Sequence, residues 1–416
     1  MGRRGTPGPH GEAADADTDG EAEAGQAAAG AGAGAGAEAA EAEAWPPGAG
    51  PGPPLWRLPE ELLLLICSYL DSQALGRLGQ VSRRLQRFTS RDLLWRPIAR
   101  ACLNSGFTPH GTDLVTNIPV KERVKVSQNW RRGRCRQGTL LKWRRNLMPW
   151  MQLEGGCLYL SQAEDIHAYQ LCPDGSSLHR RPLAIFSGHE EDVCRFVLAS
   201  SHVVSGGGDG KIGLHKINGT FSIKFSAHEQ EVNCVDCQGG VIVSGSRDRT
   251  AKVWSISSSQ LGQCLHTIQT EDRVWSIAIS PLLSGQLMTH LGRDFHRGAG
   301  VLDVLYETPS TLLSCGYDTY IRYWDIRTSS QKCVMEWEEP HDSALYCVQS
   351  DGNHMLASGS SYYGVVRLWD RRQKGCLHAF SLSSPTSSPV YCLRFSTTHL
   401  YAAVASALHV LDFKTP

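Results

Sequence analysis

Residue types that could do chemistry are frequent in this chain, but their spacing does not indicate a metal centre or a nucleophile. The one Cys-x-x-Cys pair, Cys234 and Cys237, has no second pair and no neighbouring His pair, as a zinc site would require. It also falls in a strand pattern, in which residues three apart point to opposite faces. No phosphate loop or nucleophile motif occurs. The sequence therefore predicts structural cysteines, no metal, no cofactor and no catalytic residue.

The overall composition is typical of an intracellular globular protein. The 14 cysteines lack the short, even spacing of a disulfide framework, which predicts a reducing compartment, cytoplasmic and/or nuclear. The 41 basic residues balance 41 acidic ones, so no overall field favours a nucleic acid or a membrane surface. No apolar run approaches the roughly 20 residues of a bilayer span. We therefore expect no membrane partner and no nucleic-acid partner.

Two segments, 1–54 and 103–137, are unlike the rest of the chain. Residues 1–54 are mostly Ala, Gly, Glu and Pro, which cannot bury enough surface to offset chain entropy, so they are predicted to be a disordered low-complexity tail. Between Lys121 and Arg145 lie ten basic residues against Glu122 alone. Tryptophans among arginines suggest nucleic-acid binding, but no recognisable reading module is present. We interpret 103–137 as a basic linker.

Residues 55–102 have the pattern of three or four short helices. The first is expected from Pro59 to about Leu70, and Asp71 and Ser82 are the expected caps of two further helices. The first helix contains the run LLLLI, which covers more than the single apolar stripe that a small bundle can hide. Composition alone leaves two alternatives open, a densely packed core or a permanent partner that covers the second face.

The stretch "LPEELLLLICSYLD", followed by "LGRLGQVSRRLQRF" and "DLLWR", resembles the F-box over nearly its full length. In that family the motif binds the Skp adaptor of a cullin–RING ubiquitin ligase, largely through its first Leu-Pro and the apolar helix after it. The resemblance implies adaptor contacts by Leu58, Pro59, Leu62, Ile66 and Leu70. It favours the second alternative, a permanent partner.

A repeat of about forty residues organises the C-terminal part of the chain. Strand starts of the type "VCRFV" and "VNCVD" recur at Val193, Val232, Val274, Val301, Leu345 and Val390. Successive starts differ by 39, 42, 27, 44 and 45 residues, and an earlier unit begins near Pro149. Most starts are followed by two strands of alternating pattern, joined by a tight turn, and then by an outer strand.

This series resembles the WD-repeat β-propeller over about residues 149–416. The resemblance implies an all-β propeller of seven units, with four strands in each. It also implies a buried structural tetrad in the third unit, formed by His228, Ser244, Asp248 and Trp254, in which hydrogen bonds satisfy every polar group. The His, Ser and Asp of this set therefore serve folding rather than catalysis.

Three other units depart from the tetrad pattern. The second has His215 where Trp is expected, the fifth lacks the His before Val301, and the sixth has His341 and Trp369 but no turn Asp. We expect these units to be less rigid than the third.

The fourth unit is too short by about 19 residues. In the third unit the outer strand at Gly262 follows the strand start at Val232 by about 30 residues, whereas in the fourth unit Gly285 follows Val274 by only about 11 residues. The missing residues would have carried the second and third strands, the Asp turn and the Trp. We predict that residues 274–292 are a first strand fused to a fourth strand. The chain is then a shortened form of a seven-bladed protein, less stable than its parent because sheet edges are left unpaired.

The seventh unit ends after three strands, and we predict that "GTLLKW", residues 138–143, supplies its missing outer strand and closes the ring. The expected architecture is thus an all-β WD-repeat propeller, with its fourth unit incomplete, preceded by a small all-α F-box and a disordered tail. The predicted boundaries are 1–54 for the tail, 55–102 for the F-box, 103–137 for the linker and 138–416 for the propeller.

An F-box joined to a WD-repeat propeller resembles the substrate-recognition subunit of an SCF-type ubiquitin ligase, and the chain is close to the dactylin-type F-box/WD-repeat proteins. The resemblance implies that the F-box binds the Skp adaptor and through it the cullin–RING ligase. The propeller would bind an unidentified protein substrate for ubiquitination and proteasomal degradation, without a catalytic residue of its own. Arg247 in the "GSRD" turn and Arg273 before the fourth unit are candidate substrate-binding residues, because a guanidinium matches phosphate oxygens.

Two alternatives to a working substrate receptor remain open. The first is a non-degradative WD-repeat scaffold. The second is a defective shortened form that occupies the ligase without delivering a substrate. An enzyme is disfavoured, because no metal-ligand cluster, phosphate loop or nucleophile motif is found.

Overall fold

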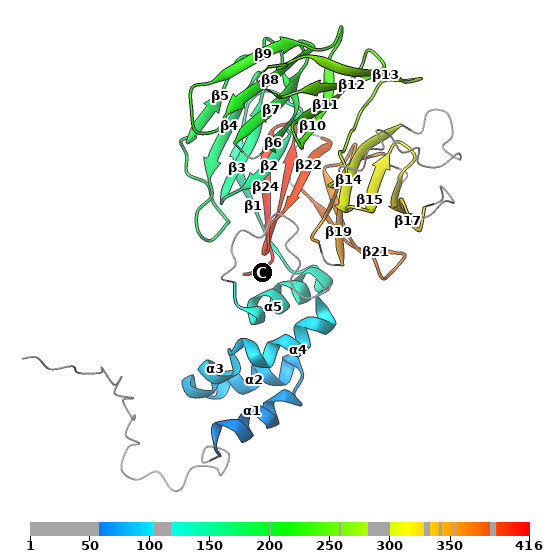
Figure 1. The fold of residues 1–416 in the computed structure, drawn as a ribbon. Coiled ribbons are helices and arrows are strands. Elements are labelled where there is room, and N and C mark those ends of the chain that lie inside the picture. Colours follow the sequence, from blue (N-terminus) through cyan, green and yellow to red (C-terminus); the bar gives the residue numbers. More distant parts are fainter. Residues whose placement is uncertain are drawn as a thin grey trace, which may run out of the picture. The chain divides into compact units, whose positions relative to one another are not determined.

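The fold was obtained as a computed structural model (Figure 1). It describes residues 58–103, 118–199, 201–257, 259–281, 300–327, 333–340, 343–352, 354–382 and 388–416. The expected disordered tail at 1–54 and the outer strand expected from Gly285 lie outside these residues.

Five helices come first in the described part of the chain: α1 Glu60–Ser68, α2 Ser72–Val81, α3 Arg83–Thr89, α4 Asp92–Cys102 and α5 Val120–Arg132. The expected caps are in place. The Asp71 side chain accepts a hydrogen bond from the Ala74 N–H at 2.7 Å, and Ser82 Oγ accepts one from the Leu85 N–H at 3.2 Å. Each cap satisfies an N–H group that the helix itself leaves unpaired.

Helix α5 lies within 103–137, the segment predicted to be a basic linker, and packs against the propeller. Val124 is fully buried and Trp130 nearly so, and the Trp130 ring stacks on Phe413 with 3.5 Å between centroids. The Asn129 side-chain amide donates to the Phe413 carbonyl at 2.7 Å. The helix ends at Gly133, whose φ of 63° is a left-handed conformation that favours glycine. The dense basic residues obscured this apolar stripe.

Within the described residues, 24 strands form six antiparallel sheets of four strands each (Figure 1). We number the blades by the seven repeats, so that blade four is the shortened one. Blade one comprises β2 Met151–Glu154, β3 Cys157–Gln162, β4 Asp165–Gln170 and β5 Ala184–Phe186. Blade two comprises β6 Val193–Ala199, β7 His202–Gly207, β8 Lys211–Lys216 and β9 Ser222–Ser226. Blade three comprises β10 Val232–Gln238, β11 Val241–Ser246, β12 Thr250–Ser255 and β13 Cys264–Gln269. Blade five comprises β14 Val301–Thr308, β15 Thr311–Gly316, β16 Tyr320–Asp325 and β17 Met335–Glu338. Blade six comprises β18 Leu345–Ser350, β19 Met355–Ser360, β20 Val365–Asp370 and β21 Cys376–Ser381. Blade seven comprises β22 Val390–Phe395, β23 His399–Val404, β24 Ala407–Asp412 and β1 Arg136–Lys142.

Strand β1 is the outer strand of blade seven. It pairs antiparallel with β24, with Gly138 opposite Val410 and Leu141 opposite Leu408. This is the position that the sequence predicts for residues 138–143. The last blade is therefore built from the two ends of the propeller segment, and β1 covers the outer edge of β24.

The hydrophobic core lies between neighbouring sheets. One cluster joins Trp130 of α5 to blades six and seven through Val366, Phe395 and Leu411. Another joins blades seven, one and two, and includes the fully buried Met151. Apolar packing between neighbouring blades thus holds blades five, six, seven, one, two and three together in that order, and no such cluster joins blade three to blade five among the described residues.

The segment 274–280 begins blade four, and it corrects the expected strand at Val274. No strand is formed there. The Val274 N–H donates to the Ser246 carbonyl of blade three at 2.9 Å, and the Val304 N–H of blade five donates to Ser276 Oγ at 3.1 Å. Its side chains are half-buried, whereas Val232 at the start of blade three is fully buried. A strand needs a partner strand, and the residues that would supply one are missing from the sequence.

Candidate adaptor-binding helix and propeller face

Helix α1 carries two apolar faces. Leu63 and Cys67, four residues apart, are buried at 8% and 2% exposure. The other face remains exposed, and its side chains, three or four residues apart, are Leu62 at 46%, Leu65 at 54%, Ile66 at 43% and Tyr69 at 82%. A contiguous exposed apolar surface of this kind marks a binding site.

The structure places the five predicted adaptor contacts unequally. Leu62 and Ile66 lie on the exposed face, Pro59 is the exposed residue before α1, and Leu58 and Leu70 are half-buried. The prediction omitted Leu65 and Tyr69, which are the most exposed large apolar residues of this helix. Their spacing of three or four residues from Leu62 and Ile66 was the available signal.

The tetrad of blade three is assembled as a closed hydrogen-bonded chain. The Asp248 carboxylate accepts from His228 Nδ1 at 2.9 Å, Ser244 Oγ donates to His228 Nε2 at 2.7 Å, and Trp254 Nε1 donates to Ser244 Oγ at 2.8 Å. Burial lowers the pKa of His228, which favours its neutral form. Because Ser244 is fully buried, no substrate can reach its hydroxyl. The arrangement holds β11 and β12 to the loop before β10 and offers no nucleophile.

Blade two keeps three members of this chain and replaces the fourth. His189 lies 2.9 Å from Asp209 and 2.8 Å from Ser205. His215 stands at the tryptophan position, and its Nδ1 lies 3.0 Å from the Ser222 hydroxyl rather than bonding Ser205. Burial lowers the pKa of His215 to about 4, with a smaller contribution from His189. Blade two therefore contains a buried neutral imidazole where blade three has an indole.

Blades five and six keep the Trp–Ser pair of the tetrad. Trp324 Nε1 donates to Ser314 Oγ at 2.8 Å, and Trp369 Nε1 donates to Ser358 Oγ at 2.9 Å. His341, the expected histidine of blade six, lies outside the described residues.

The two candidate substrate-binding arginines are exposed, and each has an acidic neighbour. Arg247 is 53% exposed and its Nη1 lies 3.2 Å from Glu231. Arg273 is 45% exposed, lies 3.9 Å from Asp272, and has its guanidinium 5.0 Å from the centre of the Trp275 ring. A phosphate group would have to compete with these carboxylates.

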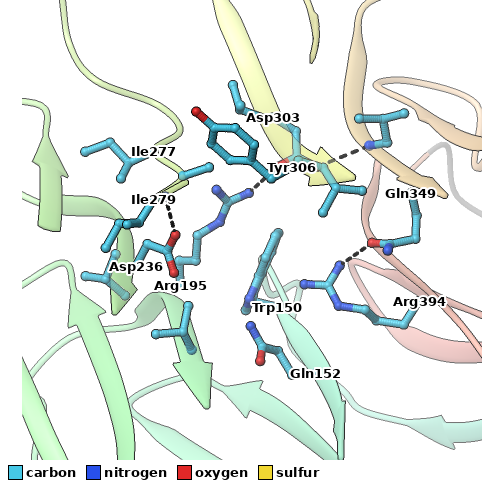
Figure 2. A pocket seen from close by; sticks show the side chains of 16 residues that line it. Trp150, Gln152, Arg195, Asp236, Ile277, Ile279, Asp303, Tyr306, Gln349 and Arg394 are labelled. Carbon is cyan, nitrogen blue, oxygen red and sulfur yellow. Dashed lines mark hydrogen bonds and ion pairs between the residues drawn. The ribbon is translucent and has the colours of Figure 1, made fainter. Parts of the chain in front are cut away.

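A cavity of about 230 Å³ lies among the inner strands of the six blades and the segment 274–280 (Figure 2). Figure 2 shows the Trp150 ring between two guanidinium groups, those of Arg195 and Arg394, whose centres lie 3.8 Å and 4.7 Å from the ring centre. Arg195 forms a buried ion pair with Asp303, with 2.7 Å between Nη2 and Oδ1. None of these residues is marked by the sequence pattern as part of a site.

Comparison with known proteins agrees with this architecture. The family model "F-box-like" matches residues 55–101, and the model "WD domain, G-beta repeat" matches 219–255 and 331–370. The chain is 73% identical over 337 residues to human F-box/WD repeat-containing protein 4, covering 76% of this chain and 82% of that protein. The chain belongs to the F-box/WD-repeat protein family. The mouse F-box/WD repeat-containing protein 4 is 72% identical over 334 residues, covering 75% of this chain and 82% of that protein.

More distant relatives of this F-box/WD-repeat protein share only part of the chain. The probable E3 ubiquitin ligase complex SCF subunit sconB of Talaromyces stipitatus is 22% identical over 211 residues, covering 49% of this chain and 29% of that protein. Among solved structures, the WD40 β-propeller domain of Doa1 superposes with a TM-score of 0.53 at 15% identity, covering 66% of this chain and 95% of that domain. This second similarity supports the propeller fold alone.

The alignment with the human protein also bears on the short fourth unit. It spans 337 positions but takes in only 76% of the 416 residues of this chain, which is about 316 residues. About 20 positions of the relative therefore have no counterpart in this F-box/WD-repeat protein. This number is close to the length that the repeat spacing predicts to be missing from the fourth unit, as expected of a shortened form.

Membrane-spanning helices and metal clusters are both absent from the described residues. No helix among them is long and apolar enough to cross a membrane. No group of three or more His, Cys, Asp or Glu side chains in the same residues is arranged to hold a metal ion.

Proposed function

We propose that this chain is the substrate-recognition subunit of an SCF-type ubiquitin ligase. The F-box binds the Skp adaptor through the exposed face of α1, and the adaptor connects it to the cullin–RING ligase. The propeller binds the protein to be ubiquitinated for proteasomal degradation. The observation that carries the proposal is the exposed row of Leu62, Leu65, Ile66 and Tyr69 within a segment that matches the F-box-like model.

Such a receptor acts by tethering rather than by chemistry. Binding a substrate next to the ubiquitin-loaded partner turns transfer into a nearly intramolecular event, so that effective concentration supplies the rate gain. The buried tetrad, with Ser244 out of reach of solvent, fits this non-catalytic role. Arg247 and Arg273 are the proposed substrate contacts, since both guanidinium groups are exposed and match a phosphate group on the substrate.

The test is co-purification with the Skp adaptor and cullin. The double variant Leu62→Asp/Ile66→Asp places two charges in the proposed interface and should lose both partners. The control is Leu183→Asp/Ile185→Asp, which changes one leucine and one isoleucine of similar exposure, 62% and 51%, in and beside β5. Both variants should keep the unfolding midpoint of the unchanged chain. Adaptor binding by the α1 variant, or equal losses in the two variants, would refute the proposal.

The shortened blade four supports a second candidate, a chain that occupies the ligase without delivering a substrate. The half-buried segment 274–280 forms no strand, and Arg273 directly precedes it. Limited proteolysis of the adaptor complex separates the two candidates. A resistant fragment that begins near Val120, and so keeps α5 with the propeller, indicates a working receptor. Digestion of the propeller with the adaptor still bound indicates the non-delivering form. A non-degradative scaffold would instead leave the half-lives of bound proteins unchanged when the F-box is deleted.

A further inference from the structure

The cavity among the inner strands contains two arginines in different electrostatic states (Figure 2). The Arg195 guanidinium is neutralised: its Nη2 lies 2.7 Å from Asp303 Oδ1, and its Nη1 donates to Ser276 Oγ at 2.7 Å. Arg394, from β22, has no carboxylate partner of this kind among the described residues. It forms no ion pair with any carboxylate in the part of the chain that the structure describes.

Arg394 is nevertheless held in a defined position. Its Nη1 donates to Gln349 Oε1 at 3.0 Å and to the Leu393 carbonyl at 2.7 Å, and its guanidinium packs over the Trp150 ring. The N–H groups of Nε and Nη2 have no acceptor among the described residues. These two nitrogens form the edge of the guanidinium that binds carboxylate and phosphate oxygens in a bidentate manner.

Gln349 adds a second donor beside this edge. Its Oε1 accepts from Arg394, so its Nε2 is the end of the amide that remains available for an acceptor. The other carboxylate on the lining besides Asp303, that of Asp236, is already engaged. It accepts from the Ile279 N–H at 2.6 Å and from the Cys237 N–H at 2.8 Å, and burial raises its pKa.

We propose that this cavity is a binding site for a small oxyanion, the carboxylate or phosphate group of a small molecule, with Arg394 and Gln349 as its ligands. The volume of about 230 Å³ lies below the roughly 300–1,000 Å³ of pockets for drug-sized ligands, so it suits a short acid or a phosphate rather than a peptide. The site is separate from the exposed Arg247 and Arg273, and the inference does not depend on the proposed role in a ubiquitin ligase.

The site has a consequence for the stability of the shortened propeller. Residues 277–279 of the short fourth unit form part of the lining. A ligand that binds only the folded state stabilises it in proportion to the logarithm of its concentration above Kd. Anion binding should therefore protect the ring at the blade that lacks two strands.

The experiment is thermal unfolding of the full chain in increasing inorganic phosphate or acetate, with chloride holding the ionic strength constant. Phosphate stabilises proteins in general, so only a saturable rise of the midpoint counts as binding. We expect a saturable rise with at least one anion. A rise with phosphate alone identifies a phosphate site, and a rise with acetate alone identifies a carboxylate site.

The variant Arg394→Gln should abolish the saturable rise, whereas the control Arg327→Gln, which changes an exposed arginine outside the cavity, should retain it. Should Arg394→Gln fail to unfold cooperatively, Gln349→Leu replaces it, with an expected increase of at least tenfold in apparent Kd. Absence of a saturable rise with both anions, or a rise that persists in the cavity variants, would overturn the proposal.

Discussion

Arg195 and Asp303 form a buried ion pair that joins blade two to blade five, with 2.7 Å between Nη2 and Oδ1. Arg195 comes from β6 and Asp303 from β14, and their side chains are only 8% and 6% exposed. Arg195 also donates to Ser276 of the short fourth unit. One side chain therefore connects blade two, blade five and the short fourth unit across the cavity, next to the place where strand pairing is missing.

The variant Arg195→Ala should lower the free energy of unfolding by about 3–5 kcal/mol, because the charge of Asp303 would stay buried without a partner. Equilibrium unfolding in urea measures the loss. The control Arg247→Ala, which breaks an exposed pair with Glu231, should cost no more than about 1 kcal/mol. Equal losses of unfolding free energy in the two variants would show that the buried pair stabilises the protein no more than the exposed pair does.

Blade two should make the protein sensitive to acid through His215. Burial lowers its pKa to about 4, whereas the unfolded side chain titrates near 6.5. Between these values the unfolded chain binds more protons than the folded one, so stability falls as the pH drops from about 6.5 towards 4, and this effect is absent above 6.5. At pH 4.5 the loss is about 2–3 kcal/mol. His215→Gln should reduce the difference between the free energies of unfolding measured in urea at pH 7 and at pH 4.5. If the variant and the unchanged chain lose equal stability over this pH range, His215 is not the cause of the acid sensitivity.

The exposed face of α1 predicts two adaptor contacts beyond those expected from the family. Leu65→Ala and Tyr69→Ala should each weaken binding of the Skp adaptor about tenfold, or about 1.4 kcal/mol, without changing the unfolding midpoint. Titration calorimetry with purified adaptor measures this. Leu63→Ala is the control on the buried face of the same helix, and it should lower stability by about 2–5 kcal/mol. Unchanged adaptor affinity in both exposed-face variants would exclude them from the interface.

Restoring the missing strands should stabilise the propeller. A typical two-strand WD-repeat insert of about 19 residues after Ser280 would pair with the segment 274–280 and cover its half-buried side chains. A gain of about 2 kcal/mol would raise the unfolding midpoint by about 4–8 °C. A Gly/Ser insert of equal length is the control. An unchanged midpoint with the strand-forming insert would contradict the shortened-blade hypothesis.

If Arg247 and Arg273 read a phosphorylated substrate, alanine at both positions should remove the phosphatase-sensitive proteins that co-purify with the chain. Adaptor binding should be unchanged. The control is Arg327→Ala, which removes another exposed arginine that is paired with an acidic neighbour, Asp325. Retention of the phosphatase-sensitive proteins by the double variant would end the phosphate-reading role.

The repeat spacing predicted much of the propeller because the residues that define each blade lie close together in the sequence. Each unit carries its own strand starts, its tight turn and, in blade three, the residues His228 and Asp248 that define the tetrad. The outer strand β1 was found because the last unit was one strand short. Helix α5 was missed because charge dominates its composition, although Val120, Val124 and Trp130 mark a buried face.

The residues of the cavity could not be predicted in the same way. Arg195 and Asp303 are 108 positions apart, and nothing near either residue indicates that ring closure brings them together. The failure of 274–280 to form a strand is likewise a tertiary effect, because an apolar alternating pattern becomes a strand only when a partner is present. Which face of α1 stays exposed also depends on how the helices pack.

The pairing of β1 with β24 also sets an order of events during protein synthesis. β1 leaves the ribosome before every other described strand of the propeller, and β24 leaves after them. The ring therefore cannot close before β24 has been synthesised, whereas helices α1 to α4 are complete long before that point. A nascent chain can present its F-box before the propeller exists, so under the proposed function capture by the adaptor and maturation of the receptor are separable in time.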